Sequence, residues 1–186
     1  MSRCAESPRI SVRNAQRKIS VNIAELETFA AKALAYCLDL RKQQRTDLRK
    51  LREVFIWLIS DRRMTVLHRK FLGQSGPTDV LTFQHGEIFI SVETARRHAR
   101  TFGEENTRRG RRVHEEGNSL MRELKLYIVH GLLHLNGFDD QTQAEARKME
   151  TAQEKILRAC TSKRNMSDLS RCELGRNARG PSLRSG

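Results

Sequence analysis

Paired cysteines are missing from this sequence. Its cysteines are Cys4, Cys37, Cys160 and Cys172, and they form no C-x-x-C pair and no regular spacing. Disulfide scaffolds and cysteine-based zinc ribbons both depend on such patterns, so neither is expected. The arrangement is typical of a protein kept in a reducing cytoplasm.

Long apolar runs are also missing. No stretch approaches the ~20 apolar residues that a membrane-spanning helix needs. The first residues, MSRCAESPRISV, contain no apolar core of signal-peptide length. No internal repeat is visible. The sequence therefore predicts a soluble, cytoplasmic protein without a membrane partner.

Acidic residues are scarce relative to basic ones. The chain holds 35 Lys and Arg against 22 Asp and Glu, which gives a net charge of +13 and a pI near 10.3. A field of this sign attracts polyanions, with nucleic acid first and an acidic membrane surface second. The same excess could instead be a solubilising surface with a basic tail. We expect nucleic acid as the partner.

One motif carries most of the functional information. His130 and His134 stand four residues apart in YIVHGLLHLNGFDD, and Gly137 and Asp140 complete the pattern H-x3-H-x2-G-x2-D. Residues i and i+4 of a helix lie on the same face, so both imidazoles can face one ion. A glycine that ends the helix can adopt a left-handed backbone, which lets a later residue return to that ion. The pattern predicts a three-ligand site with an open position, the catalytic form of a zinc site.

The neighbours of the two histidines favour a metal over two solvated side chains. They are Leu124, Leu126, Ile128, Val129, Leu132, Leu133 and Leu135. Histidines on so apolar a helix need polar partners, and one shared ion satisfies both. Asp140 is the preferred third ligand, and the adjacent Asp139 is the alternative. The other histidines are not excluded as ligands: His68, His85, His98 and His114.

Periodicity and turn residues predict alternating strands and helices. Strands are expected at 9–13, 54–60, 80–83 and 87–91, the last two as a hairpin around 84–86. Helices are expected at 21–40, 61–71, 93–102, 119–136 and 143–160. Asn22 is the expected cap of the first helix and Asp61 that of the second. Gly103 follows the third helix, and a Thr142–Glu145 capping box begins the last. Polar or charged connections are expected at 41–50, 73–77 and 104–118.

These elements form the pattern of one small α/β (α+β) domain. We expect a mixed sheet of about four strands and about five helices, with the histidine helix packed on one face. Hydrophobic residues make up 38% of the chain, which is enough for one core. The domain is expected to span residues 9–160, between a flexible N-terminus at 1–8 and a basic, disordered tail at 161–186.

Several segments together resemble the YbeY-type endoribonucleases of rRNA maturation. They are HGLLHLNGFDD, PTDVLTF at 77–83, Gly86-Glu87-Ile88, and the last helix with Glu145-Ala146, Met149-Glu150 and Glu154. The likeness covers residues 9–158. It implies a zinc-dependent endoribonuclease specific for single-stranded RNA. It further implies action on the small ribosomal subunit, in maturation of the 16S rRNA 3′ end and in ribosome quality control.

Three positions depart from the pattern of that family. Asp140 stands where the family usually has a third histidine; aspartate remains a zinc ligand, but it makes the site harder and more tolerant of Mn or Fe. Leu72 stands where an arginine often precedes the glycine of the loop before PTDVL. Glu87 replaces the usual aspartate. The basic residues that could take the place of the arginine are Arg63, Arg69 and Lys70.

The leading hypothesis is metal-assisted cleavage of RNA by His130, His134 and Asp140, with water or a phosphate oxygen at the open position. Basic residues beside the site would hold the phosphate backbone. The candidates are Arg69, Lys70, Arg96, Arg97, Arg100, Arg108, Arg109, Arg111 and Arg112. The sequence identifies neither a general base nor an oligomeric state.

Two other functions stay open. A metallopeptidase shares the histidine spacing, but it needs H-E-x-x-H with glutamate as general base, and that position is Gly131. A non-catalytic RNA-binding factor of ribosome assembly, with a structural or weakened metal site, agrees with the departures at Leu72 and Asp140.

Overall fold

The chain forms a mixed four-stranded sheet with the order β1-β2-β4-β3. The central strand β2 (Glu53–Ile59) is parallel to β1 (Arg9–Asn14) on one side and to β4 (Glu87–Ser91) on the other. Strand β3 (Val80–Phe83) pairs antiparallel with β4 through a tight turn. The structure confirms the predicted mixed sheet, the central strand near 54–60 and the hairpin around residues 84–86.

The computed structural model describes residues 7–40, 47–106 and 114–162, and the side chains of 47, 102–106 and 114–118 lie outside that description. Most of the predicted N-terminal segment at 1–8 and of the tail at 161–186 lies outside these ranges. No helix within them is long and apolar enough to cross a membrane.

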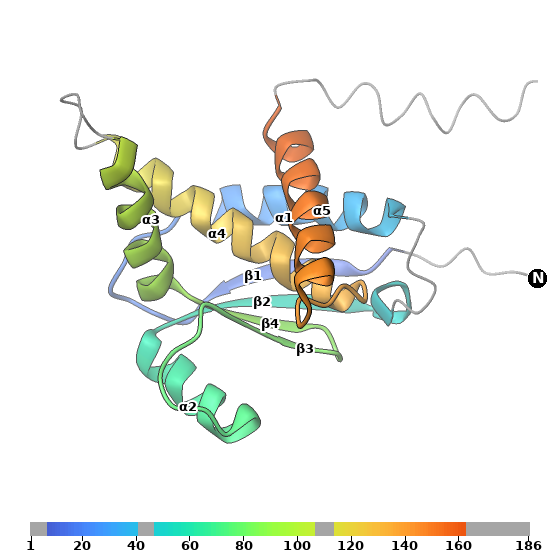
Figure 1. Cartoon of the computed structure of the whole chain (residues 1–186), viewed down its shortest axis with the longest axis horizontal. Coiled ribbons are helices and arrows are strands. Elements are labelled where there is room, and N and C mark those ends of the chain that lie inside the picture. The colour runs from blue at the N-terminus through green and yellow to red at the C-terminus, as the bar shows by residue number, and fades with distance from the viewer. Residues whose placement is uncertain (1–6, 41–46, 107–113, 163–186) are drawn as a thin grey trace, which may run out of the picture.

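The helices cover the two faces of the sheet unequally (Figure 1). Helices α1 (Ile23–Asp39), α4 (His114–Leu135) and α5 (Gln143–Thr161) lie on one side of the sheet, and α2 (Asp61–Leu72) lies on the other. Helix α3 (Val92–Asn106) follows β4 directly and packs along α4. A small α/β domain with the histidine helix on one face is what the sequence predicted.

The main core lies between the sheet and the three-helix side. Alternate strand residues point into it, as period-two alternation requires. They are Val12, Val54, Ile56, Leu58, Ile88 and Ile90. A second, smaller cluster lies on the opposite face, where Met64 of α2 packs on Ile59 and Leu81. The sheet is therefore covered fully on one face and in part on the other.

Two of the predicted helix N-caps are confirmed, and one is wrong. The Asn22 side chain accepts a hydrogen bond from the Glu25 backbone N–H, and Thr142 with Glu145 forms the predicted capping box. Helix α2, however, is capped by Ser60, whose hydroxyl accepts from the Arg63 backbone N–H. Serine and aspartate are equally good caps, so the residue type alone could not decide between two neighbours.

Asp61 serves a different purpose from the predicted cap. As the first residue of α2, it accepts hydrogen bonds from the hydroxyls of Ser91 and Thr94 and pairs with Arg97. Its backbone N–H donates to the Glu93 carboxylate at 2.7 Å. These contacts join the start of α2 to the start of α3.

The predicted boundaries around residue 104 are also corrected. Helix α3 continues through Gly103 to Asn106, and α4 begins at His114 rather than at residue 119. A glycine within a helix lowers its stability by about 1 kcal/mol, which packing between two helices can offset. The connection at 41–50 likewise contains a short 3-10 helix, Asp47–Lys50.

Candidate metal centre

The C-terminal half of α4 brings the two histidines to one point. His130 and His134 lie one turn apart, and the distance between their Nε2 atoms is 3.1 Å. Both side chains are partly exposed, whereas Leu132 and Leu133 on the same turn are fully buried. The apolar residues fix the rotation of the helix, and this rotation leaves the imidazoles at the surface.

The chain reverses directly after the helix and returns a carboxylate to the histidines. Gly137 has a φ of 82°, its N–H donates to the His134 carbonyl, and the Phe138 N–H donates to the Leu133 carbonyl. This is a Schellman C-cap with glycine in the left-handed conformation. Beyond it, Asp140 Oδ2 lies 3.8 Å from His130 Nε2 and 4.0 Å from His134 Nε2.

The ring orientations leave both Nε2 lone pairs free for an ion. The Nδ1 atom of His134 lies 3.1 Å from the Phe138 carbonyl oxygen, which can only accept, so Nδ1 carries the proton. The Nδ1 atom of His130 lies 3.3 Å from Oε1 of Gln153 on α5. Metal-binding histidines are usually held in this way by an oxygen acceptor behind the ring. The lone pairs of the two Nε2 atoms, which are 3.1 Å apart, repel each other unless a proton or a cation lies between them.

The electrostatic surroundings keep His130 neutral. Burial lowers its pKa, and the neighbouring His134 lowers it further, while Asp79 and Asp140 act in the opposite direction. A neutral imidazole is the form that binds a metal. His130, His134 and Asp140 thus form a group whose ligand atoms lie within 4.8 Å of one another, and the types of these atoms fit zinc or a similar ion.

A polar stripe extends from the histidines along α4. Glu123 and Tyr127 lie on the same face as His130, and both are buried. Burial raises the pKa of Glu123, and it also raises the pKa of Tyr127, with Asp79 adding to both shifts. Asp79, in the loop before β3, therefore lies within electrostatic reach of the whole stripe. Its side chain is held by the Thr78 hydroxyl and the Val80 backbone N–H.

Asp79, Glu123 and Gln153 are the residues of this site that sequence reasoning missed. Asp79 lies within PTDVLTF, a segment that resembles the family, but the sequence alone does not indicate that its side chain faces the histidine helix. Glu123 precedes His130 by seven residues, and this helical spacing was a usable signal. Gln153 comes from a separate helix, so no local pattern pointed to it.

The residue that follows His130 faces the sheet rather than the site. A Cβ atom at Gly131 would lie 2.6 Å from Cγ2 of Ile88 on β4. Glycine is therefore required here by the close approach of α4 to the sheet. The position where a peptidase would carry its glutamate is buried in the core.

Three further histidines, whose side chains the structure describes, lie outside this group. His68 is buried on α2 with Nδ1 2.9 Å from the Gly76 carbonyl oxygen, and His85 is exposed and paired with Glu87. His98 of α3 lies with Nδ1 2.6 Å from the Tyr127 hydroxyl. The side chain of His114 lies outside the described residues. The alternative carboxylate of Asp139 is not part of the group that the described residues form, and it accepts from the Asp140 backbone N–H.

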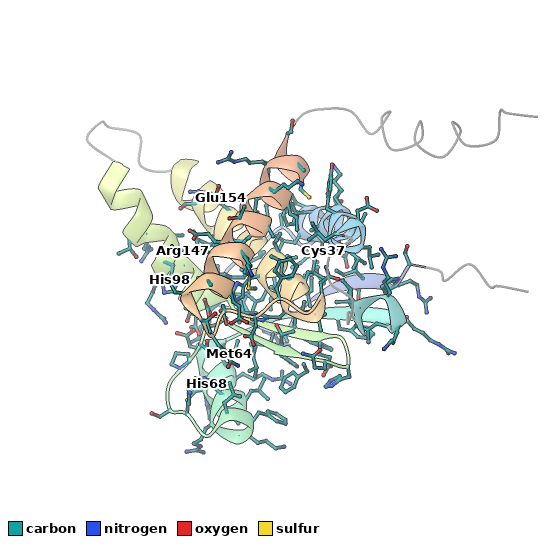
Figure 2. The ribbon with its side chains drawn as sticks, turned by 45° about the vertical axis from the view of Figure 1, so that its right-hand side comes forward. Cys37, Met64, His68, His98, Arg147 and Glu154 are labelled. Carbon is teal, nitrogen blue, oxygen red and sulfur yellow. The ribbon has the colours of Figure 1, made fainter. Side chains whose placement is uncertain are left out.

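The basic residues proposed for RNA divide between two sides of the molecule. Arg96 and Arg100 are exposed on α3, where Arg97 is engaged with Asp61. In Figure 2, His98 of α3 and Arg147 of α5 lie on one side of the sheet, and Met64 and His68 of α2 lie on the other. The predicted residues Arg108, Arg109, Arg111 and Arg112 lie outside the described part of the chain.

Helix α2 carries the remaining candidates, on the far side of the sheet from α4. Arg63, Arg69 and Lys70 are exposed there, as is Leu72, the residue that stands where the family often has arginine. Any contact of these residues with RNA would therefore be made away from the histidine group.

Replacement of Gly137 by alanine should weaken the C-cap and displace Asp140. A side chain at φ 82° is strained, so we expect the free energy of unfolding to fall by about 1 kcal/mol. Zinc affinity should fall as well, measured by titration against a chromogenic chelator. Gly137→Asn is the matched control, since asparagine tolerates this backbone region, and it should retain most of both properties. Equal values for the alanine variant and wild type would contradict the role of this turn.

The fold and the site together define a small α/β domain with a candidate metal centre of two histidines and one aspartate. The model of the family described as Endoribonuclease YbeY matches residues 11–161. The chain therefore belongs to the YbeY endoribonuclease family.

Individual relatives agree with this assignment. A protein named Endoribonuclease YbeY from Anaeromyxobacter sp. (strain Fw109-5) is 34% identical over 58% of this chain and 54% of its own length. One from Moorella thermoacetica is 37% identical over 56% and 70%, and one from Chlamydia trachomatis serovar D is 28% identical over 81% and 87%. The chain thus spans about half the length of the first of these relatives.

A solved structure also shares the fold. The solution structure of TM1509 from Thermotoga maritima superposes with a TM-score of 0.52 over 81% of this chain and 88% of that one, at 24% identity. This likeness supports the fold alone.

Proposed function

We propose that this protein is a metal-dependent endoribonuclease that cleaves single-stranded RNA. The observation that carries the proposal is the convergence of the His130, His134 and Asp140 ligand atoms at the end of α4. Family membership supports RNA as the substrate, and the net charge of +13 is consistent with a polyanion. By the same family argument, we propose that it acts in maturation of the 16S rRNA 3′ end and in ribosome quality control.

The residues of the site have separate roles in this proposal. His130, His134 and Asp140 would hold one ion, zinc first and Mn or Fe as alternatives. When bound, the ion supplies Lewis-acid chemistry that acidifies water and polarises a phosphate oxygen. Gln153 and the Phe138 carbonyl fix the tautomer and direction of the two rings. Arg96 and Arg100, which are exposed on α3, would contact the phosphate backbone.

Metal removal tests the proposal on the protein itself. We expect cleavage of a 5′-labelled single-stranded RNA to fall about 100-fold or more after exhaustive dialysis against a chelator. Addition of zinc or manganese to the dialysed protein should restore the rate, and the same RNA annealed to its complement should resist cleavage. A rate that is indifferent to the chelator would exclude the proposed chemistry.

A non-catalytic role in ribosome assembly is the second candidate function, since Leu72 replaces a frequent family arginine and is 56% exposed. The two functions differ in one measurement. A variant without the histidines should fail to rescue an rRNA-processing defect if cleavage is the function. Rescue equal to wild type would assign binding instead.

A further inference from the structure

The face of the sheet that carries α2 gathers half of the aromatic side chains of the chain. Of one Trp, two Tyr and seven Phe in the sequence, the Trp and four Phe lie here. They are Phe55 and Trp57 of β2, Phe83 of β3, Phe89 of β4 and Phe71 of α2. In the strands these residues alternate with the core residues, so they point away from α1, α4 and α5.

These rings form one continuous row of contacts across the strands. Trp57 stacks on Phe55 with ring centroids 6.4 Å apart and on Phe89 at 6.3 Å, with interplanar angles of 28° and 13°. Phe83 then meets Phe89 edge-on at 5.7 Å, and Phe71 meets Phe83 edge-on at 4.8 Å. We call these five residues the aromatic row.

The aromatic row is only partly covered by the described residues. Among the described helices, α2 alone lies on this side of the sheet (Figure 1). Its Met64 packs with Ile59 and Leu81, and Trp57, Phe83 and Phe89 pack against the edge of that cluster. The strand rings are half-buried, and Phe71 remains 52% exposed. The aromatic row therefore keeps part of its surface accessible, most of all at Phe71, and accessible apolar surface of this kind is a feature of interaction sites.

The charges around the aromatic row are those that attract a polyanion. Helix α2 presents the exposed basic residues Arg62, Arg63, Arg69 and Lys70. Lys70 Nζ lies 5.4 Å from the centre of the Phe71 ring. On the other side of the row, the exposed Arg13 of β1 is in register with Trp57.

The acidic residues of this face are already engaged. Glu53 pairs with Arg9 at 2.6 Å. Glu87 accepts a hydrogen bond from Trp57 Nε1 at 3.2 Å and pairs with His85 at 2.9 Å. The pairing with Glu87 also holds the indole in place beside its stacked neighbours.

We propose that the aromatic row is a second RNA-binding surface, on which unpaired bases of a single strand stack while α2 and Arg13 contact the phosphates. Stacked aromatic rings flanked by basic residues on an open sheet face are how single-stranded nucleic acid is held without sequence preference. The choice of RNA as ligand rests on the proposed function, but the surface is separate from the histidine group. A flat apolar face for a protein partner would not require the basic border.

Trp57 is the only tryptophan of the chain, so its fluorescence reports on this surface alone. We expect decauridylate, added to the full chain in chelator, to quench Trp57 in a saturable manner. Inorganic polyphosphate of equal charge should cause no comparable quenching, because it has no bases to stack. Equal quenching by polyphosphate, or no quenching by decauridylate, would overturn the proposal.

Substitutions on α2 locate the binding surface. Phe71→Ala should weaken decauridylate binding about 5- to 100-fold, as expected for loss of one stacking ring. Val66→Ala is the matched control, since Val66 is 53% exposed on the same helix outside the aromatic row, and it should bind as wild type. Equal affinities of the two variants would contradict the proposal. A concentration-dependent dimer that Phe71→Ala breaks and RNA does not affect would assign the surface to a second copy of the chain instead.

The double variant His130→Ala, His134→Ala separates this proposal from the proposed function. It should bind decauridylate with unchanged Trp57 quenching. If wild type cleaves RNA and the double variant does not, unchanged quenching in the double variant would support both proposals. If neither protein cleaves RNA and both show quenching, the surface would be supported and the nuclease refuted. Cleavage by wild type without any quenching would support the nuclease and refute the surface.

Discussion

Replacement of His134 by alanine should abolish metal binding and RNA cleavage together. One of three converging ligand atoms is removed, and the ring that the Phe138 carbonyl holds in place is lost. Loss of a partner behind a metal-binding histidine already weakens binding roughly 10- to 100-fold, so loss of the ligand itself should reduce zinc affinity by about 100-fold or more. The cleavage rate should fall at least as far. Metal content measured on the purified protein, and a labelled single-stranded RNA, give the two values.

Matched variants identify which residues hold the ion. His85→Ala removes an exposed histidine outside the group and should leave the metal content unchanged. Asp140→Ala should lose most of the metal, whereas Asp140→His, which introduces the residue frequent in the family, should keep it. Full metal retention in Asp140→Ala would move the third ligand to another residue, and retention in His134→Ala would refute the site.

Replacement of Gly131 by glutamate should unfold the domain or nearly so. The side chain would enter the space of Ile88, where even a Cβ lies 2.6 Å from Cγ2, and its carboxylate would have no polar partner between α4 and β4. A buried, uncompensated charge lowers stability by roughly 3–5 kcal/mol, which is most of the stability of a small domain. Urea unfolding followed by circular dichroism measures the loss.

Two further variants calibrate this effect. Gly131→Ala introduces the steric overlap without the charge and should lower the free energy of unfolding by about 1–3 kcal/mol. Gln143→Glu places a new glutamate on an exposed position of α5 and should change stability by less than about 0.5 kcal/mol. A folded Gly131→Glu variant of near wild-type stability would show that α4 does not pack on β4 as described.

Strand and helix positions were predictable from the sequence because apolar periodicity is a local property. The run near residues 54–60 gave the central strand, and Thr142 with Glu145 gave the start of α5. Boundaries that depend on tertiary contact were missed. Asp61 has the residue type of a good cap, yet its partners Ser91, Thr94 and Arg97 are 30 or more residues away along the chain.

The ligand group was predictable for a similar reason, since His130, His134 and Asp140 belong to one helix and its following turn. The residues that orient or surround it were not, because Gln153 and Asp79 reach it from other elements. The aromatic row escaped prediction on the same ground. Alternation shows that a strand has two faces, but only the packed structure shows that one of them is left partly uncovered.

The third ligand of the candidate centre, the Asp140 carboxylate, is carried by a surface turn and not by the packed helix. The Asp140 side chain is 46% exposed, and it lies beyond the Gly137 reversal, outside the core. A mutation at this position can therefore change the ligand type without any change in the packing of α4. A substitution at this position is therefore expected to alter metal preference without a loss of fold stability.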